Sequence, residues 1–345
     1  MFKWHFNSLK FFTQSKVPPN DLCDLLSRTT LGTNGARYQH LDTPDRLKEM
    51  DNPLYLSLIR NNKTIANVTF CKRSVGWYVR YFAFDGHFQS VKTNKTNTRK
   101  SSFLKKELKQ FFLDRLNVKD TNQFYAYVDA ENERSIRMTE TFGFKRIAQL
   151  ETNSFSRIRP KCKLQLAKLK DKAAIKSLVL PVFQSKRFFT PYHILNSKGS
   201  FYAVYQNNEV VAFGKFYKAN WKIHALPGKN GQILVKILPF IPIINRVINP
   251  EKFSFLVPEA VWIRDNNKEL LSNFFESVLQ KEKHKTIMWW NASNDSLLNA
   301  VKSQIKWGLL NKLSKPKKVD LVALSQSDDT GNQKDEIYTV GIDFI

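Results

Sequence analysis

Cysteine is scarce in this chain of 345 residues, which contains only three. Cys23, Cys71 and Cys162 are far apart, and they form no C-x-x-C pair and no cluster with histidine. The sequence therefore supports neither a disulfide framework nor a zinc site, and we expect no bound metal. Because a reducing compartment is the default for such a chain, we expect a cytoplasmic protein.

Acidic residues are also scarce, with 30 Asp and Glu against 55 Lys and Arg, and the formal net charge is +25. A surface of this sign attracts polyanions, such as nucleotide phosphates, nucleic acids and anionic lipid headgroups. A lysine-rich solvated surface explains the same excess. The charge alone therefore leaves the class of partner open.

Apolar runs long enough to cross a membrane are missing. The run from Ile233 to Ile248 is interrupted by Lys236, Arg246 and two prolines, so we expect no integral membrane segment. The surrounding residues, 221–250, have no counterpart in the first half and are predicted to be an insertion. They could cover a pocket, touch a membrane surface or pack as ordinary protein.

Hydrophobic residues make up 42% of the chain and aromatic residues 13%, which is enough to fill two cores. Strand-like and helix-like segments follow in the same order in both halves. The residue pattern also predicts an opening strand at 2–12, a helix that starts at Ser101 or Ser102 and a strand from Ile337. One constant offset relates the two predicted hairpins, because it pairs Asn61-Asn62 with Asn207-Asn208 and Phe70 with Phe216. We therefore predict a mixed α/β protein of two tandem domains, 1–158 and 159–345.

The most informative stretch runs from Phe124 to Phe144. A strand pattern is followed by Asn132, Arg134 and Ser135, then by a helical pattern that stops at Gly143-Phe144. This order resembles the acetyl-CoA-binding half of the GCN5-related N-acetyltransferase (GNAT) superfamily, which has a strand, N-x-[RK]-[AS], a helix and G-F. The resemblance implies two tandem GNAT-like acyl-CoA N-acyltransferase domains.

The resemblance also implies a cosubstrate, acetyl-CoA or another acyl-CoA, whose acyl group passes to a small-molecule or peptide amine. Asn132 would contact pantetheine. The pyrophosphate would lie at the start of the preceding helix, where backbone N–H groups favour anions. We expect a basic loop to end there, with Arg99, Lys100, Ser101 and Ser102 as the cofactor-binding residues.

The sequence departs from this family in two ways. Neither half has the glycine-rich phosphate motif, and Thr139 stands where the family's tyrosine general acid is expected.

Candidate general bases are Asp85, His87 and Glu259, the last because burial in an apolar stretch would raise its pKa. The sequence therefore assigns no catalytic residue.

Two alternatives stay open. A Fem-like aminoacyltransferase also has tandem GNAT domains, and its tRNA substrate would suit the positive charge. A non-catalytic protein that keeps the fold as a scaffold would explain the missing glycines and tyrosine. The sequence indicates neither the acceptor nor the oligomeric state.

Overall fold

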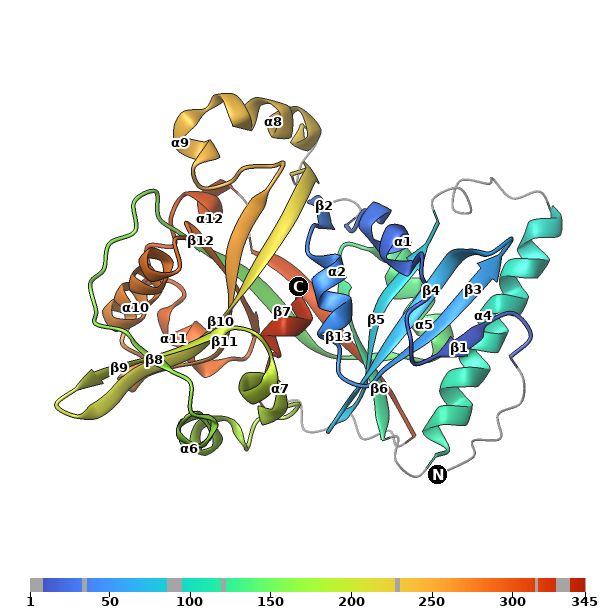
Figure 1. Cartoon of the computed structure of the whole chain (residues 1–345), viewed down its shortest axis with the longest axis horizontal. Helices are drawn as coiled ribbons and strands as arrows, with labels where there is room; N and C mark the ends of the chain where they lie inside the picture. Colours follow the sequence, from blue (N-terminus) through green and yellow to red (C-terminus); the bar gives the residue numbers. More distant parts are fainter. Residues whose placement is uncertain are drawn as a thin grey trace.

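One continuous sheet runs through the whole molecule (Figure 1). The computed structural model describes residues 9–32, 36–85, 95–118, 122–226, 230–313, 316–326 and 336–344. The described strands are β1 (Thr13–Ser15), β2 (Arg37–His40), β3 (Pro53–Arg60), β4 (Lys63–Arg73), β5 (Gly76–Phe84), β6 (Gln123–Asp129), β7 (Lys145–Ser156), β8 (Ala167–Leu169), β9 (Ser200–Gln206), β10 (Glu209–Ala225), β11 (Phe253–Ile263), β12 (Thr286–Ala292) and β13 (Lys317–Ser325). Their order across the sheet is β1-β3-β4-β5-β6-β13-β7-β12-β11-β10-β9-β8, and β2 pairs with β10.

Helices cover both faces of this sheet. The described helices are α1 (Leu22–Arg28), α2 (Thr43–Lys48), α4 (Lys95–Leu116), α5 (Glu133–Phe142), α6 (Lys172–Phe183), α7 (Pro191–Asn196), α8 (Gly231–Ile237), α9 (Pro242–Asn245), α10 (Lys268–Lys281), α11 (Ser296–Val301) and α12 (Leu309–Leu313), with 3-10 turns η1 (Leu238–Phe240), η2 (Arg264–Asn266) and η3 (Gly341–Phe344). In the N-terminal half, α4 and α5 pack on one face through a cluster that includes Phe70, Phe112 and Phe142. No helix among the described residues is long and apolar enough to cross a membrane.

The two halves share strands. β13, which is late in the chain, pairs antiparallel with both β6 and β7 of the N-terminal half. β7 in turn pairs antiparallel with β12, and β2 of the N-terminal half pairs with β10. The boundary predicted at 158/159 thus falls just after β7, and each side of it contributes strands beside the other. Whether those segments are separate folding units stays a prediction.

The internal duplication is visible in backbone detail. Asn61, Asn62, Asn207 and Asn208 all have positive φ, between 50° and 62°, as the predicted tight hairpins require. Each half also has a β-bulge in its third long strand, where Tyr81 (φ 52°) and the equivalent Ala260 (φ 51°) take left-handed conformations. Beyond each bulge, the strand separates from its parallel neighbour.

Three elements predicted from the residue pattern differ from the structure. An opening strand was expected at 2–12, but residues 1–8 lie outside the described part and the first described strand is β1. The helix expected to start at Ser101 or Ser102 starts at Lys95, because no glycine or proline stops it from extending past the serines. The strand expected from Ile337 forms only a single bridge and then the turn η3.

The segment 336–344 is held by side chains instead of a strand ladder. The Glu259 carboxylate accepts hydrogen bonds from the Tyr338 hydroxyl (2.9 Å) and the Gly341 N–H (2.9 Å). A side chain at Gly341 would collide with Glu259, because a Cβ there would lie 2.9 Å from the Glu259 Cβ. Glu259 is buried, and burial raises its pKa to about 7, although Tyr338 and the Lys215 ammonium oppose the rise.

Residues 1–158 expressed alone should fail to fold cooperatively. Without β13, β6 and β7 each lose a ladder of backbone hydrogen bonds in the middle of a sheet. Circular dichroism and amide NMR would measure this, with the full chain as the control. A well-dispersed spectrum from the fragment would contradict the prediction and support an independent N-terminal domain.

Glu259 should make stability depend on pH. Its pKa is raised from 4.5 to about 7, so the folded state holds its proton more tightly than the unfolded state. The resulting stabilisation is complete below pH 4.5 and is lost as pH rises through about 7. It amounts to at most about 3 kcal/mol of unfolding free energy. In Glu259→Gln, the unfolding free energy measured by denaturant titration should fall less over that pH range.

The exposed Glu251 offers the matched control, because Glu251→Gln removes the same charge from a side chain that is 70% accessible. That variant should keep the wild-type pH profile. An unchanged profile in Glu259→Gln would show that Glu259 ionises normally.

Candidate functional site

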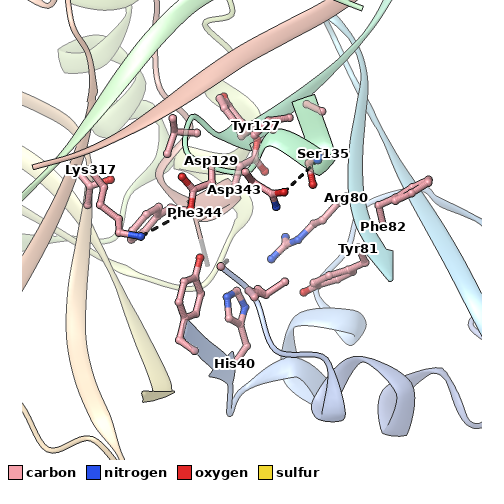
Figure 2. A pocket seen from close by; sticks show the side chains of 18 of the residues that line it. His40, Arg80, Tyr81, Phe82, Tyr127, Asp129, Ser135, Lys317, Asp343 and Phe344 are labelled. Atoms are coloured by element: carbon pink, nitrogen blue, oxygen red, sulfur yellow. Dashed lines mark hydrogen bonds and ion pairs between the residues drawn. The ribbon is translucent and has the colours of Figure 1, made fainter. Parts of the chain in front are cut away.

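One candidate site is a cavity of about 420 Å³ where the two halves meet (Figure 2). Most of its lining is apolar, and several polar side chains also face it. Residues that line it include Tyr38, His40, Tyr78, Arg80, Tyr81, Phe82, Phe112, Tyr127, Asp129, Asn132, Ser135, Met138, Thr139, Phe142, Trp221, Ile248, Trp290, Lys317, Asp343 and Phe344. Strands β5 and β6 form one wall, and the end of β10 and segment 336–344 form another.

The cavity exists because two parallel strands separate. β5 and β6 pair only at Trp77 with Phe124 and at Tyr78 with Tyr125. After Tyr78 the bulge at Tyr81 bends β5 and increases its local twist. The remainder of β5 therefore leaves β6, and side chains of both strands line the space between them.

The bulge brings polar groups to this wall. The Tyr81 carbonyl accepts a hydrogen bond from the Asn67 side-chain amide (3.3 Å), which supports the unusual backbone. The Arg80 guanidinium lies over the Tyr81 ring, 4.5 Å from the ring centroid. The buried Tyr81 hydroxyl has no hydrogen-bond partner among the described residues, so it is available to a ligand.

Asn132 lies at the cavity, at the start of helix α5. Its side-chain oxygen accepts a hydrogen bond from the Ser135 N–H (3.1 Å) and so caps the helix, as its residue type favours. Its amide NH₂ is not used by this cap. Thr139, two turns further along the same helix, also lines the cavity, and its hydroxyl donates to the Ile136 carbonyl (2.8 Å).

Three stacked rings form part of the opposite wall. Tyr38 and His40 of β2 both stack on Trp221 of β10, with centroid distances of 4.0 Å and 5.4 Å. Burial lowers the pKa of His40 to about 3, with help from Arg80 and Arg46, so the imidazole is neutral at pH 7. Both His40 nitrogens and the Trp221 indole nitrogen are buried without partners in the described structure. These orphaned atoms would suit polar groups of a ligand.

The C-terminal segment supplies a buried carboxylate. Asp343 forms an ion pair of 2.7 Å with Arg73, and both side chains are at most 5% exposed. Tyr78 donates a hydrogen bond to the Asp343 main-chain carbonyl (3.1 Å). Burial raises the pKa of Asp343, while Arg73 and Arg80 oppose that rise. Its second carboxylate oxygen has no partner within the described ranges.

The structure places the sequence-predicted residues differently. Asn132 lines the cavity, whereas Arg99, Lys100, Ser101 and Ser102 lie inside helix α4 and their side chains are outside the described part. They are thus in the helix instead of the loop before it, and their role stays a prediction.

Neither of the two candidate bases that the structure describes lies at the cavity. His87 lies outside the described residues. Asp85 and Glu259 are not part of the cavity lining. Glu259 is buried with a raised pKa, as expected, but its two hydrogen bonds hold segment 336–344. The position of Glu259 therefore indicates that it anchors segment 336–344.

Sequence reasoning missed Tyr81, His40 and Asp343. Tyr81 carries no signal, because a bulge within an aromatic strand has no distinctive residue type. His40 ends the short strand β2, and its partner residue, Trp221, is 181 positions away. Asp343 could have been found, because it is an acid in the apolar stretch GIDFI, the same signal that singled out Glu259.

No family model and no curated protein sequence matches the chain. Solved structures do. N-myristoyltransferase from Saccharomyces cerevisiae with bound myristoyl-CoA aligns over 97% of this chain and 86% of its own, with 10% identity and a TM-score of 0.56. A second structure of that enzyme gives a TM-score of 0.57 at 10% identity, over 97% of this chain and 90% of its own.

A GCN5-related N-acetyltransferase from Sphaerobacter thermophilus aligns over 91% of this chain and 95% of its own, with 10% identity and a TM-score of 0.49. The likeness to the yeast enzyme covers both halves of the chain. The mixed α/β architecture predicted from the sequence is confirmed, and the chain has the GCN5-related N-acetyltransferase fold.

Proposed function

We propose that this protein is an acyl-CoA-dependent N-acyltransferase whose acyl-CoA site is in the N-terminal half. One observation carries the proposal: β5 and β6 separate after two paired residues, and the resulting cavity meets the N-terminus of α5 at Asn132. A gap of this kind admits an extended chain such as pantetheine between two strands. The yeast enzyme of the same fold was solved with bound myristoyl-CoA, which supports the choice of donor.

The wall at the bulge would activate the thioester. A bulge leaves the ladder groups of its extra residue unpaired, so backbone N–H groups near Tyr81 are placed to polarise the thioester carbonyl. The acceptor amine would attack this carbonyl, and the negative charge that develops on its oxygen would be stabilised by the same N–H groups. The C–S bond would then break, the proton lost by the amine nitrogen would go to the departing CoA thiolate, and the amide product would form in one transfer without a covalent enzyme intermediate.

The volume of the cavity limits the length of the acyl chain that it can hold. Acetyl-CoA is the donor that the sequence resemblance favours, and an acetyl group needs space for a single methyl. The observed 420 Å³, lined by Phe82, Met138, Phe142 and other apolar side chains, also offers room for a longer chain. The amine would approach from the side of His40 and Asp343, where unpartnered polar atoms face the cavity.

Acyl-CoA should stabilise the protein against heat. A ligand at about 100 times its dissociation constant adds roughly 2.7 kcal/mol to the unfolding free energy, which raises the melting temperature by several degrees. We expect shifts with acetyl-CoA and with longer acyl-CoAs, measured by differential scanning fluorimetry. The chain length that gives the largest shift at equal concentration identifies the donor. Absence of any shift at low salt, with a shift from tRNA, would instead favour an aminoacyltransferase.

Arg99→Ala combined with Lys100→Ala should weaken CoA binding about tenfold or more, because two cations near the CoA phosphates are lost. Isothermal titration calorimetry with CoA measures the effect. The matched control replaces Lys105 and Lys106, two exposed cations further along α4, with the same change in charge. Equal affinities for the two double variants would place the phosphate site elsewhere.

A further inference from the structure

An exposed apolar patch stands on the insertion between β10 and β11. Its members are the outward-facing side chains of α8, η1 and the next residue: Ile233 (58% exposed), Leu234 (45%), Ile237 (47%), Phe240 (84%) and Ile241 (38%). Figure 1 shows α8 and α9 projecting beyond the ends of β10 and β11. Large apolar side chains gathered in this way mark an interaction site.

The inner side of the same segment is already packed against the C-terminal half. Leu238, Val247 and Ile248 are buried in the core cluster of the C-terminal half, and Val235 and Ile244 pack against it. The segment is therefore apolar on two sides, although one side faces solvent. A helix with apolar residues all round is expected to be covered on all sides, so the outer side lacks a cover.

The charges beside the patch select its partner. Among the described residues from 230 to 252, Lys236, Arg246 and Lys252 are exposed cations, and the one acid, Glu251, is paired with Lys222 at 2.6 Å. The chain as a whole carries +25. A second copy of this chain would bring like charges together, whereas a bilayer with anionic headgroups offers opposite charge and an apolar interior.

The patch also adjoins the cavity. Leu226 and Ile248 line the cavity, and they border the helical segment at its two ends. The Leu226 N–H donates to the Gly231 carbonyl (3.2 Å), which ties this wall to the first turn of α8. A surface bound to the outer side of α8 would thus lie next to the opening between the halves.

We propose that α8, η1 and α9 dock on the surface of an anionic lipid bilayer. Phe240, Ile237 and Ile233 insert among the headgroups and upper acyl chains, and Lys236 and Arg246 contact the headgroup charges. The segment lies in the interface and does not span the membrane. This docking is independent of the acyl transfer proposed above, because it involves the outer side of the insertion alone.

Flotation of the full chain with vesicles tests the proposal. Vesicles of phosphatidylcholine mixed with phosphatidylserine should bind the protein, binding should weaken with added salt, and pure phosphatidylcholine should bind far less. Phe240→Ser should lower partitioning about tenfold, because its apolar ring no longer leaves water. The matched control is Phe103→Ser, a change of the same kind at a 56% exposed position on α4, which should bind like wild type.

Each remaining outcome decides against the docking. Wild-type binding by Phe240→Ser, or equal losses in both variants, would show that the patch is not the contact. No binding to any vesicle would overturn the proposal outright. A concentration-dependent dimer in sedimentation velocity that Phe240→Ser abolishes would assign the patch to a second copy. Melting curves of the two variants show that each is folded.

Discussion

The hydrogen-bond ladder of β13 is the interaction on which the rest of the structure depends. This strand lies between β6 and β7, so a segment from the end of the chain completes the middle of the N-terminal sheet. β7 then pairs with β12 and extends the sheet into the C-terminal half. Backbone groups in the interior of a sheet must be paired, so the two halves hold a fixed relation to each other. The cavity between them follows from that relation.

Small local irregularities convert this rigid sheet into a site. The bulge at Tyr81 turns β5 away from β6, and the equivalent bulge at Ala260 turns β11 away from β12. The two halves use their gaps differently. The N-terminal gap opens into the cavity, whereas segment 336–344 packs beside the second bulge, where Glu259 holds it. The two equivalent gaps are thus used differently: the first borders the cavity described above, and the second borders segment 336–344 of the chain itself.

Local signals in the sequence predicted what is local in the structure. The Asn pairs of both hairpins, the Asn132 cap and the left-handed Gly143 follow from conformational preferences of single residues, and all are present. Partners far apart in sequence were not predictable, because period and propensity do not say which strands pair. Three contacts between such distant partners are the position of β13, the pairing of β2 with β10 and the ion pair of Asp343 with Arg73. The serines at 101 and 102 were misleading because a capping preference is weak against continued helix formation.

The late position of β13 also constrains how the protein is made. Synthesis runs from the N-terminus, and the strand that fits between β6 and β7 leaves the ribosome after both of them and after all the residues between β7 and β13. Until then, the edges of β6 and β7 expose unpaired backbone and apolar side chains, which favour aggregation. Pairing residues almost 200 positions apart is slow because a long loop must close first. A chaperone that shields nascent strand edges would therefore raise the yield of folded protein.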